Sequence, residues 1–173
     1  MALFVIYGNE NSGKTHTCWL IYSLLKNAGK RIDYKSHPTQ PDWTFSEVIQ
    51  HIEDTFNHVV GTPQASDFRA LFEYNGKKVA IISAGDYVHD DNWVVTSFDD
   101  NMKWAESNMA DHVICCTRSL NRKGSVQRYI LDNYRMSIYR WYYKNQVYVL
   151  QEQIAEAQKV ALVIIADIKR NLD

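Results

Sequence analysis

Short apolar runs alternate along this chain with longer stretches in which apolar residues recur every three or four positions. The short runs 2–7, 79–82 and 112–117 are typical of strands that are buried on both faces of a sheet. Helical spacing of apolar residues marks five longer stretches, at 15–27, 45–59, 94–105, 125–131 and 150–171. This alternation predicts an α/β fold with three layers, in which helices cover a mainly parallel sheet.

The pair Asn75-Gly76 separates two strand-like runs, 68–74 and 77–83. Two residues of this type between such runs predict a type I′ hairpin. Because the second run is almost wholly apolar, we expect it to be a central strand and the first run to be an antiparallel edge strand. Further strands are predicted at 31–35 and at 138–143, the latter as an aromatic edge strand.

Two helix starts have capping signals in the sequence. Thr44 and Glu47 have the spacing of a capping box, which predicts a helix beginning at Phe45. Asp90 or Asp91 is predicted to cap the helix whose apolar stripe begins at Val94.

Composition limits the class of protein. With 173 residues, of which 46% are hydrophobic and 13% aromatic, the chain is expected to form a single domain over 1–173 with a sizeable core. The net charge of −1 gives no general attraction to nucleic acid or to an anionic membrane. No stretch has the length of a signal peptide or a membrane span, and the three cysteines have no metal-binding spacing. Free buried thiols and a cytoplasmic location without membrane partners are therefore expected.

The most specific motif is the segment of residues 8–15, Gly-Asn-Glu-Asn-Ser-Gly-Lys-Thr, which we call the glycine loop. It follows the apolar run 2–7 and precedes a predicted helix. Gly8 and Gly13 permit close approaches and backbone angles that a Cβ would block. Backbone amides between them can surround an anion, with the positive end of the next helix behind it. Lys14 can reach outer phosphates, and the Thr15 hydroxyl can help to hold Mg²⁺.

Through this motif the chain resembles the P-loop NTPase superfamily, whose Walker A pattern is G-x-x-x-x-G-K-[ST]. The resemblance implies the three-layer P-loop NTPase fold and a nucleoside triphosphate bound with Mg²⁺. It implies nucleotide contacts from the glycine loop and its neighbour: Gly8, Asn9, Glu10, Asn11, Ser12, Gly13, Lys14, Thr15 and His16. The guanine-reading motif Asn-Lys-x-Asp has no match, so ATP is expected rather than GTP. The hairpin and the glycine loop are also similar to small, uncharacterised bacterial P-loop proteins, which assign no reaction.

Other chemistry is expected at the ends of the predicted strands, since ligands of such sheets bind beyond the carboxyl ends. The strand ending at Ile82 is followed by Ser83 and Asp86, which we predict to hold Mg²⁺ together with Thr15. The strand ending at Thr117 is followed by Arg118 and, in the same polar stretch, Arg122. These arginines and Lys14 are the predicted catalytic residues, neutralising charge on a transferring phosphoryl group.

Segment 118–144 is strongly basic, with seven basic residues against one acidic residue. One interpretation is a lid over phosphates, as in nucleotide kinases, and a second is a nucleic-acid surface, because aromatic residues interleave with the charges. The third is a solvated face whose aromatic side chains fill an edge of the core.

Three functions follow from these observations. The favoured one is Mg²⁺-dependent binding and hydrolysis of a nucleoside triphosphate. The second is a small-molecule or nucleotide kinase that uses residues 118–128 as a phosphate lid over a phosphate-bearing second substrate. The third is a nucleotide-binding module without turnover, or a nucleic-acid-associated protein. The segment His89-Asp90-Asp91 is a further candidate for a catalytic carboxylate, although a helix cap is the preferred interpretation.

Overall fold

The computed structural model describes residues 1–120 and 122–170 of the chain. Its strands are β1 Ala2–Gly8, β2 Lys30–His37, β3 Asp67–Tyr74, β4 Lys77–Ile82, β5 His112–Arg118 and β6 Ile138–Lys144. Its α-helices are α1 Lys14–Ala28, α2 Phe45–Phe56, α3 Phe98–Ser107, α4 Val126–Asn133 and α5 Leu150–Arg170. The predicted elements are therefore confirmed in type, and the predicted end of the last helix at Asn171 lies outside the described residues.

The strands form one mixed sheet in the order β2-β3-β4-β5-β1-β6. The pairs β4 with β5, β5 with β1, and β1 with β6 are parallel. Strand β3 runs antiparallel to both β2 and β4. The expectation that β3 would be an edge strand is wrong, because β2 pairs along its free side and becomes the edge. The expectation that β6 would be an edge strand is confirmed.

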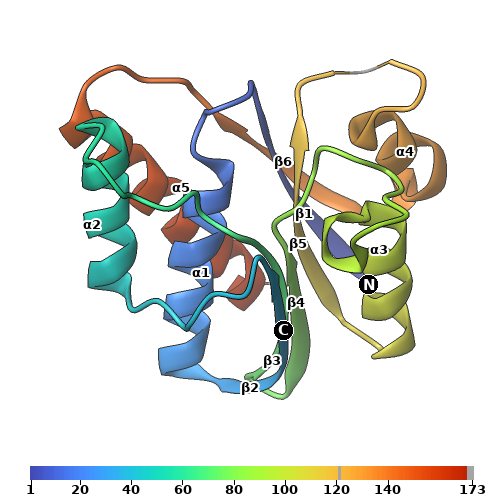
Figure 1. Ribbon diagram of the computed structural model, residues 1–173. Helices are drawn as coiled ribbons and strands as arrows, with labels where there is room; N and C mark the ends of the chain where they lie inside the picture. Colours follow the sequence, from blue (N-terminus) through green and yellow to red (C-terminus); the bar gives the residue numbers. More distant parts are fainter. Residues whose placement is uncertain (121, 171–173) are drawn as a thin grey trace.

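Helices cover both faces of the sheet, as Figure 1 shows. One core cluster joins a sheet face to α1, α2 and α5, with Trp19 and Tyr22 among its fully buried side chains. The other cluster joins the opposite face to α3 and α4, through Phe98, Met102 and Ile130. Alternate residues of the central strands serve the two clusters, which explains why these strands are apolar throughout. The three-layer α/β architecture predicted from the sequence is confirmed.

The cysteines are buried and unpaired by disulfides, as expected. Cys18 of α1 and Cys116 of β5 bring their sulfur atoms to 3.2 Å beneath the glycine loop. The hydrogen bond between them and their burial raise the pKa of the Cys18 thiol. A thiol kept protonated in this way is a poor nucleophile, so Cys18 contributes to packing. Among the described residues, no helix has both the length and the apolar character needed to cross a membrane.

The capping box of α2 is present. Glu47 N donates to Thr44 Oγ1 over 3.2 Å, and the Glu47 carboxylate accepts from Thr44 N over 3.4 Å. Replacing Thr44 with alanine should therefore lower the free energy of unfolding by about 1 kcal/mol, because the amide of Glu47 loses its acceptor. Urea unfolding measures this change, and Thr44→Ser should retain most of the stability. Equal losses in the two variants would contradict a capping role for the hydroxyl.

Helix α3 begins later than the sequence indicates. The interval 94–96 is a separate short 3₁₀ turn, and Ser97 is the N-cap of α3. The expectation that Asp90 or Asp91 caps this helix is wrong. The carboxylate of Asp90 accepts from the amides of Asn92 and Trp93 and from the hydroxyl of Thr96, and that of Asp91 contacts His89. Asp90 therefore organises the turn before the helix, since a short acidic side chain satisfies nearby backbone donors first.

Candidate functional site

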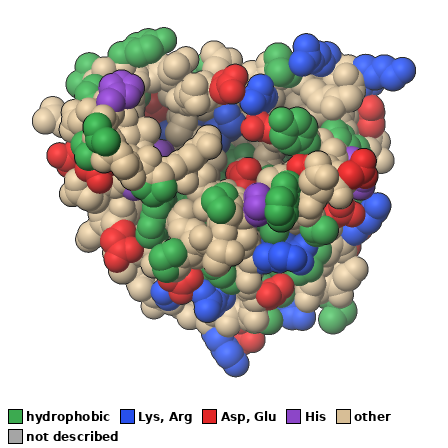
Figure 2. Space-filling model, viewed as in Figure 1, with side chains coloured by type: hydrophobic (Ala, Val, Ile, Leu, Met, Phe, Trp, Pro, Cys, Tyr) green, Lys and Arg blue, Asp and Glu red, His purple; other side chains and the backbone are tan. Residues whose placement is uncertain are grey.

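The candidate site lies at the edge of the sheet where β1, β4, β5 and β6 end. Strand β3, being antiparallel, begins at this edge with Asp67. This edge is uppermost in Figure 1, and Figure 2 shows Lys or Arg and Asp or Glu side chains meeting along it. The topology therefore collects polar residues from distant parts of the chain above the buried strands.

The glycine loop connects β1 to α1 across this edge. Asn11 and Gly13 have left-handed backbone angles, with φ of 60° and 84°. A Cβ on Gly8 would lie 2.5 Å from the carbonyl oxygen of Lys144 and 2.8 Å from Ser12 Oγ, so this position requires glycine. The first N–H groups of α1 point out of the helix end beside this loop, where helix geometry leaves them without intrahelical acceptors.

Lys14 folds its side chain back over the glycine loop. Its Nζ donates to the carbonyl oxygens of Asn9 (2.7 Å) and Gly8 (3.1 Å) and to Ser12 Oγ (3.4 Å). Burial lowers the pKa of Lys14, while the nearby Cys116 and Asp86 oppose this effect. This ammonium is partly buried and its acceptors are neutral carbonyl oxygens. Because an ammonium forms stronger hydrogen bonds with anionic oxygens, an anion at this position would replace the carbonyl acceptors.

Thr15 and His16 follow Lys14 in the first turn of α1, and both are partly buried. The His16 ring lies 2.8 Å from that of His51, measured from Nε2 to Nδ1. Burial, then His51 and Lys144, lowers the pKa of His16 to about 4, so this side chain is neutral at pH 7. The predicted nucleotide contact of His16 remains a prediction, and the structure assigns its imidazole a partner on α2.

Arg118 connects the predicted elements of the site. Its Nε donates to Asp86 over 2.8 Å, and one of its terminal nitrogens donates to Glu10 of the glycine loop over 3.2 Å. The hydrogen bond to Asp86 raises the pKa of the guanidinium, which stays charged. The carboxylate of Asp86 is half exposed. The chain therefore brings together Lys14, Asp86 and Arg118, three of the residues that the sequence predicts to act together.

Asp67 is a site residue that was not expected from the sequence. Ser83 Oγ donates to its carboxylate over 3.3 Å and accepts from the amide of Phe68 over 2.8 Å. Ser83 thus links β3 and β4, and whether it also contacts a metal remains a prediction. Burial raises the pKa of Asp67 to about 6, and repulsion from Asp86 adds to the shift. A bound cation at this edge would therefore stabilise the ionised form of Asp67.

The raised pKa of Asp67 predicts a pH-dependent stability. Its pKa is near 3.8 in the unfolded chain and about 6 in the folded protein, so folding favours the protonated form. This contribution to stability is complete below about pH 4 and is lost as the pH rises through 6. Asp67→Asn should therefore raise the free energy of unfolding at pH 7.5 by roughly 2 kcal/mol and change it little at pH 4.

Urea unfolding of wild type and Asp67→Asn at both pH values measures this effect. Glu53→Gln, at an exposed position of α2, controls for the loss of one negative charge. A difference between Asp67→Asn and wild type that is the same at both pH values would contradict the buried, ionised carboxylate.

Lys144 is the second site residue that was not expected from the sequence. It ends β6 opposite Gly8 of β1, and its side chain is only 2% exposed. The carboxylate of Glu156 on α5 lies 4.0 Å from its Nζ. Burial lowers the pKa of Lys144, Glu156 opposes this, and Lys14 lowers it further. A second ammonium therefore lies beside the glycine loop.

Arg122 is exposed and is not brought to the glycine loop. It lines a cavity of about 380 Å³ together with Asp86, Arg118 and Lys123. A neighbouring cavity of about 540 Å³ shares Lys123 and continues along α4. The glycine loop lines neither cavity, so both are open spaces beside it.

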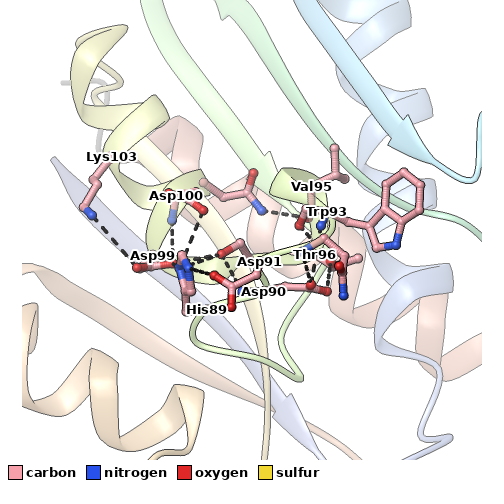
Figure 3. A network of polar contacts seen from close by, with 12 residues as sticks. His89, Asp90, Asp91, Trp93, Val95, Thr96, Asp99, Asp100 and Lys103 are labelled. Carbon is pink, nitrogen blue, oxygen red and sulfur yellow. Dashed lines mark hydrogen bonds and ion pairs between the residues drawn. The ribbon is translucent and has the colours of Figure 1, made fainter.

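The loop between β4 and α3 forms a separate polar network, shown in Figure 3. His89 contacts Asp99 over 3.2 Å and Asp91 over 2.9 Å, and the hydrogen bond to Asp99, followed by that to Asp91, raises its pKa. His89, Asp99 and Asp100 also bring possible ligand atoms within 4.8 Å of one another. Because these carboxylates already share an imidazole and helix-start donors, the network is explained as support for the loop.

Comparison with known proteins gives no further assignment, because no family model, curated protein or solved structure matches the chain. The geometry of this edge therefore carries the functional argument.

Proposed function

We propose that the protein binds a nucleoside triphosphate, preferably ATP, with Mg²⁺ and hydrolyses it. The observation that supports this most strongly is the convergence of three charged groups on the glycine loop. Lys14 lies on the loop itself, and Arg118 joins the loop to Asp86 through Glu10. These groups come from the ends of β1, β4 and β5, and their chemistry suits a polyphosphate with a divalent cation.

The residues fit a magnesium ion on chemical grounds. Mg²⁺ prefers oxygen ligands and retains several waters, so it needs few protein groups. Thr15 and Asp86 are the proposed ligands, and Ser83 and Asp67 are proposed to hold metal-bound waters. A cation nearby would favour the ionised form of Asp67, whose pKa is raised by burial. Bound Mg²⁺ would neutralise part of the charge on the outer phosphates.

The chain's own groups perform the rest of the proposed chemistry. Backbone N–H groups at the start of α1 bind phosphate oxygens, and Lys14 exchanges its carbonyl acceptors for them. Arg118 is held at the outer end of the site, where its guanidinium can stabilise charge that develops during transfer. Its contact with Glu10 suggests that closing the glycine loop on a ligand also positions the arginine.

Phosphate release from ATP and from GTP, each with and without Mg²⁺, tests this function. We expect Mg²⁺-dependent release that is faster with ATP and requires no acceptor. Tight binding of ATP without any release would instead support a nucleotide-binding module. No binding of either nucleotide, measured by titration calorimetry, would refute the proposal.

Phosphoryl transfer to a second substrate is the other function that an observation favours. The cavities beside Asp86 are lined by Arg118, Arg122, Lys123 and Arg128, so a phosphate-bearing acceptor would find positive charge next to the transferring group. ADP formation that depends on an added nucleoside or nucleoside monophosphate would identify this function. A nucleic-acid surface has less support, because four residues of the basic segment face carboxylates, namely Arg118, Arg128, Arg140 and Lys144.

A further inference from the structure

Lys144 is an enclosed ammonium that the proposed function does not yet use. Its side chain is 2% exposed, yet the nearest carboxylate oxygen, on Glu156, lies 4.0 Å from Nζ, beyond hydrogen-bond distance. Buried lysines are rare unless they are well paired, because removing an ammonium from water is costly. The distance to Glu156 is too long for this carboxylate alone to explain why the Lys144 ammonium is buried.

The Lys144 ammonium is directed toward the backbone of the glycine loop. A Cβ built on Gly13 would lie 4.0 Å from Lys144 Nζ and 3.9 Å from its Cε. Gly13 immediately precedes α1, so the ammonium lies beside the positive end of that helix as well as near Lys14. Two ammonium groups and a helix N-terminus therefore lie close together. Glu156 faces Lys144 and Asp86 lies near Lys14, and the positive charge beside Lys144 suits an anion.

The two strands that flank β1 place Arg118 and Lys144 on opposite sides of the glycine loop, so the two cations face different parts of a bound polyphosphate. Strand β5, with Arg118, pairs on one side of β1, and β6, with Lys144, pairs on the other. Arg118 and Asp86 mark the end of the site where the outer phosphate is proposed to react. Lys144 thus lies on the opposite side, toward the inner phosphates and the nucleoside.

We infer that Lys144 is a second phosphate-binding cation, which contacts the inner phosphates that ATP and ADP have in common. This inference rests on the proposed function and adds to it the recognition of the part of the nucleotide that is not transferred. An interaction with groups present in both nucleotides contributes equally to both affinities. Lys144 and Lys14 then divide the polyphosphate between them.

Titration calorimetry with ADP and with Mg²⁺ and a non-hydrolysable ATP analogue tests the inference. Lys144→Met should weaken both ligands by a similar factor, about tenfold or more, as expected for the loss of one charged hydrogen bond. Lys159→Met, at an exposed position of α5, is the matched control and should bind like wild type. Wild-type ADP affinity in a folded Lys144→Met variant would overturn the inference and leave the proposed function intact.

A second variant separates ligand binding from a structural role. Glu156→Gln removes the carboxylate that faces Lys144 and should strengthen ADP binding severalfold. If Lys144 and Glu156 only hold α5 against β6, both variants would weaken binding, and that result would also overturn the inference. Where Lys144→Met does not fold, the direction of the Glu156→Gln effect decides. Failure of the wild type to bind either ligand would instead refute the proposed function.

Discussion

Replacing Gly85 with alanine is expected to lower the free energy of unfolding by about 3 kcal/mol or more. A Cβ at this position would collide with the carbonyl oxygen of Cys116 and lie 2.9 Å from the amide nitrogen of Thr117. These are backbone atoms of β5, which cannot turn aside as a side chain can. The segment after β4 must therefore move away from β5, and the contact between Asp86 and Arg118 would be disturbed with it.

Urea unfolding of Gly85→Ala measures this loss, and Gly61→Ala is the control. Gly61 has a φ of 84°, but a Cβ added there would have no atom within 4 Å, so alanine brings backbone strain of about 1 kcal/mol without a collision. We expect the loss at Gly85 to be several times that at Gly61. Similar losses would show that residue 85 does not pack against β5 as described.

The hydrophobic pattern is sufficient to predict the elements and the layers of this fold, but not the sheet order. Apolar runs such as 79–82 indicate strands covered on both faces, and that inference holds. The neighbour of β3 could not be inferred, because β2 is largely exposed and carries four charged residues among its eight. Such a strand gives little apolar signal, although its backbone pairs with β3 from Asp67 to Glu73. Edge strands are often polar for this reason.

Asp67 could have been placed from the hairpin alone. A two-residue turn at Asn75-Gly76 pairs Tyr74 with Lys77, and extending this register places Asp67 opposite Ala84. The start of an antiparallel strand therefore lies at the carboxyl edge of its partner. In a parallel sheet, the carboxyl ends of the strands are sufficient to locate site residues. In a hairpin, the first residue of the antiparallel partner strand lies at the same edge and is a candidate as well.

Lys144 could not have been placed from sequence. The total charge of the basic segment 118–144 says little, because position in the fold decides what each residue does. Arg122 is exposed, Arg128 forms an ion pair with Asp132 one helical turn away, and Lys144 is enclosed beside the glycine loop. Only the parallel pairing of β6 with β1 brings the last of these residues to the loop.

The largest functional effect is expected from Lys14. Lys14→Ala should reduce ATP turnover by a factor of about 100 to 1,000, the usual loss when a preorganised group that stabilises transition-state charge is removed. The ammonium already lies within 3.1 Å of two loop carbonyl oxygens, so it needs only a short movement to reach a bound phosphate. Since it contacts the outer phosphates under the proposed function, kcat should fall more than the affinity for ADP.

Stability measurements distinguish a catalytic loss from a folding defect. Lys14→Ala leaves the carbonyl groups of Gly8 and Asn9 without this donor, but they still accept from the amides of Ser119 (3.1 Å) and Ser12 (3.2 Å). The free energy of unfolding should therefore fall by about 1 kcal/mol at most. Lys30→Ala, at an exposed position at the start of β2, should match wild type in turnover. A melting temperature that rises with Mg²⁺ and ATP in wild type, and rises less in Lys14→Ala, would place the ligand on the glycine loop. Among the residues that the structure describes, Lys14 alone has a side-chain ammonium that donates to the carbonyl oxygens of Gly8 and Asn9. Undiminished phosphate release by a folded Lys14→Ala variant would therefore mean that the reaction occurs elsewhere.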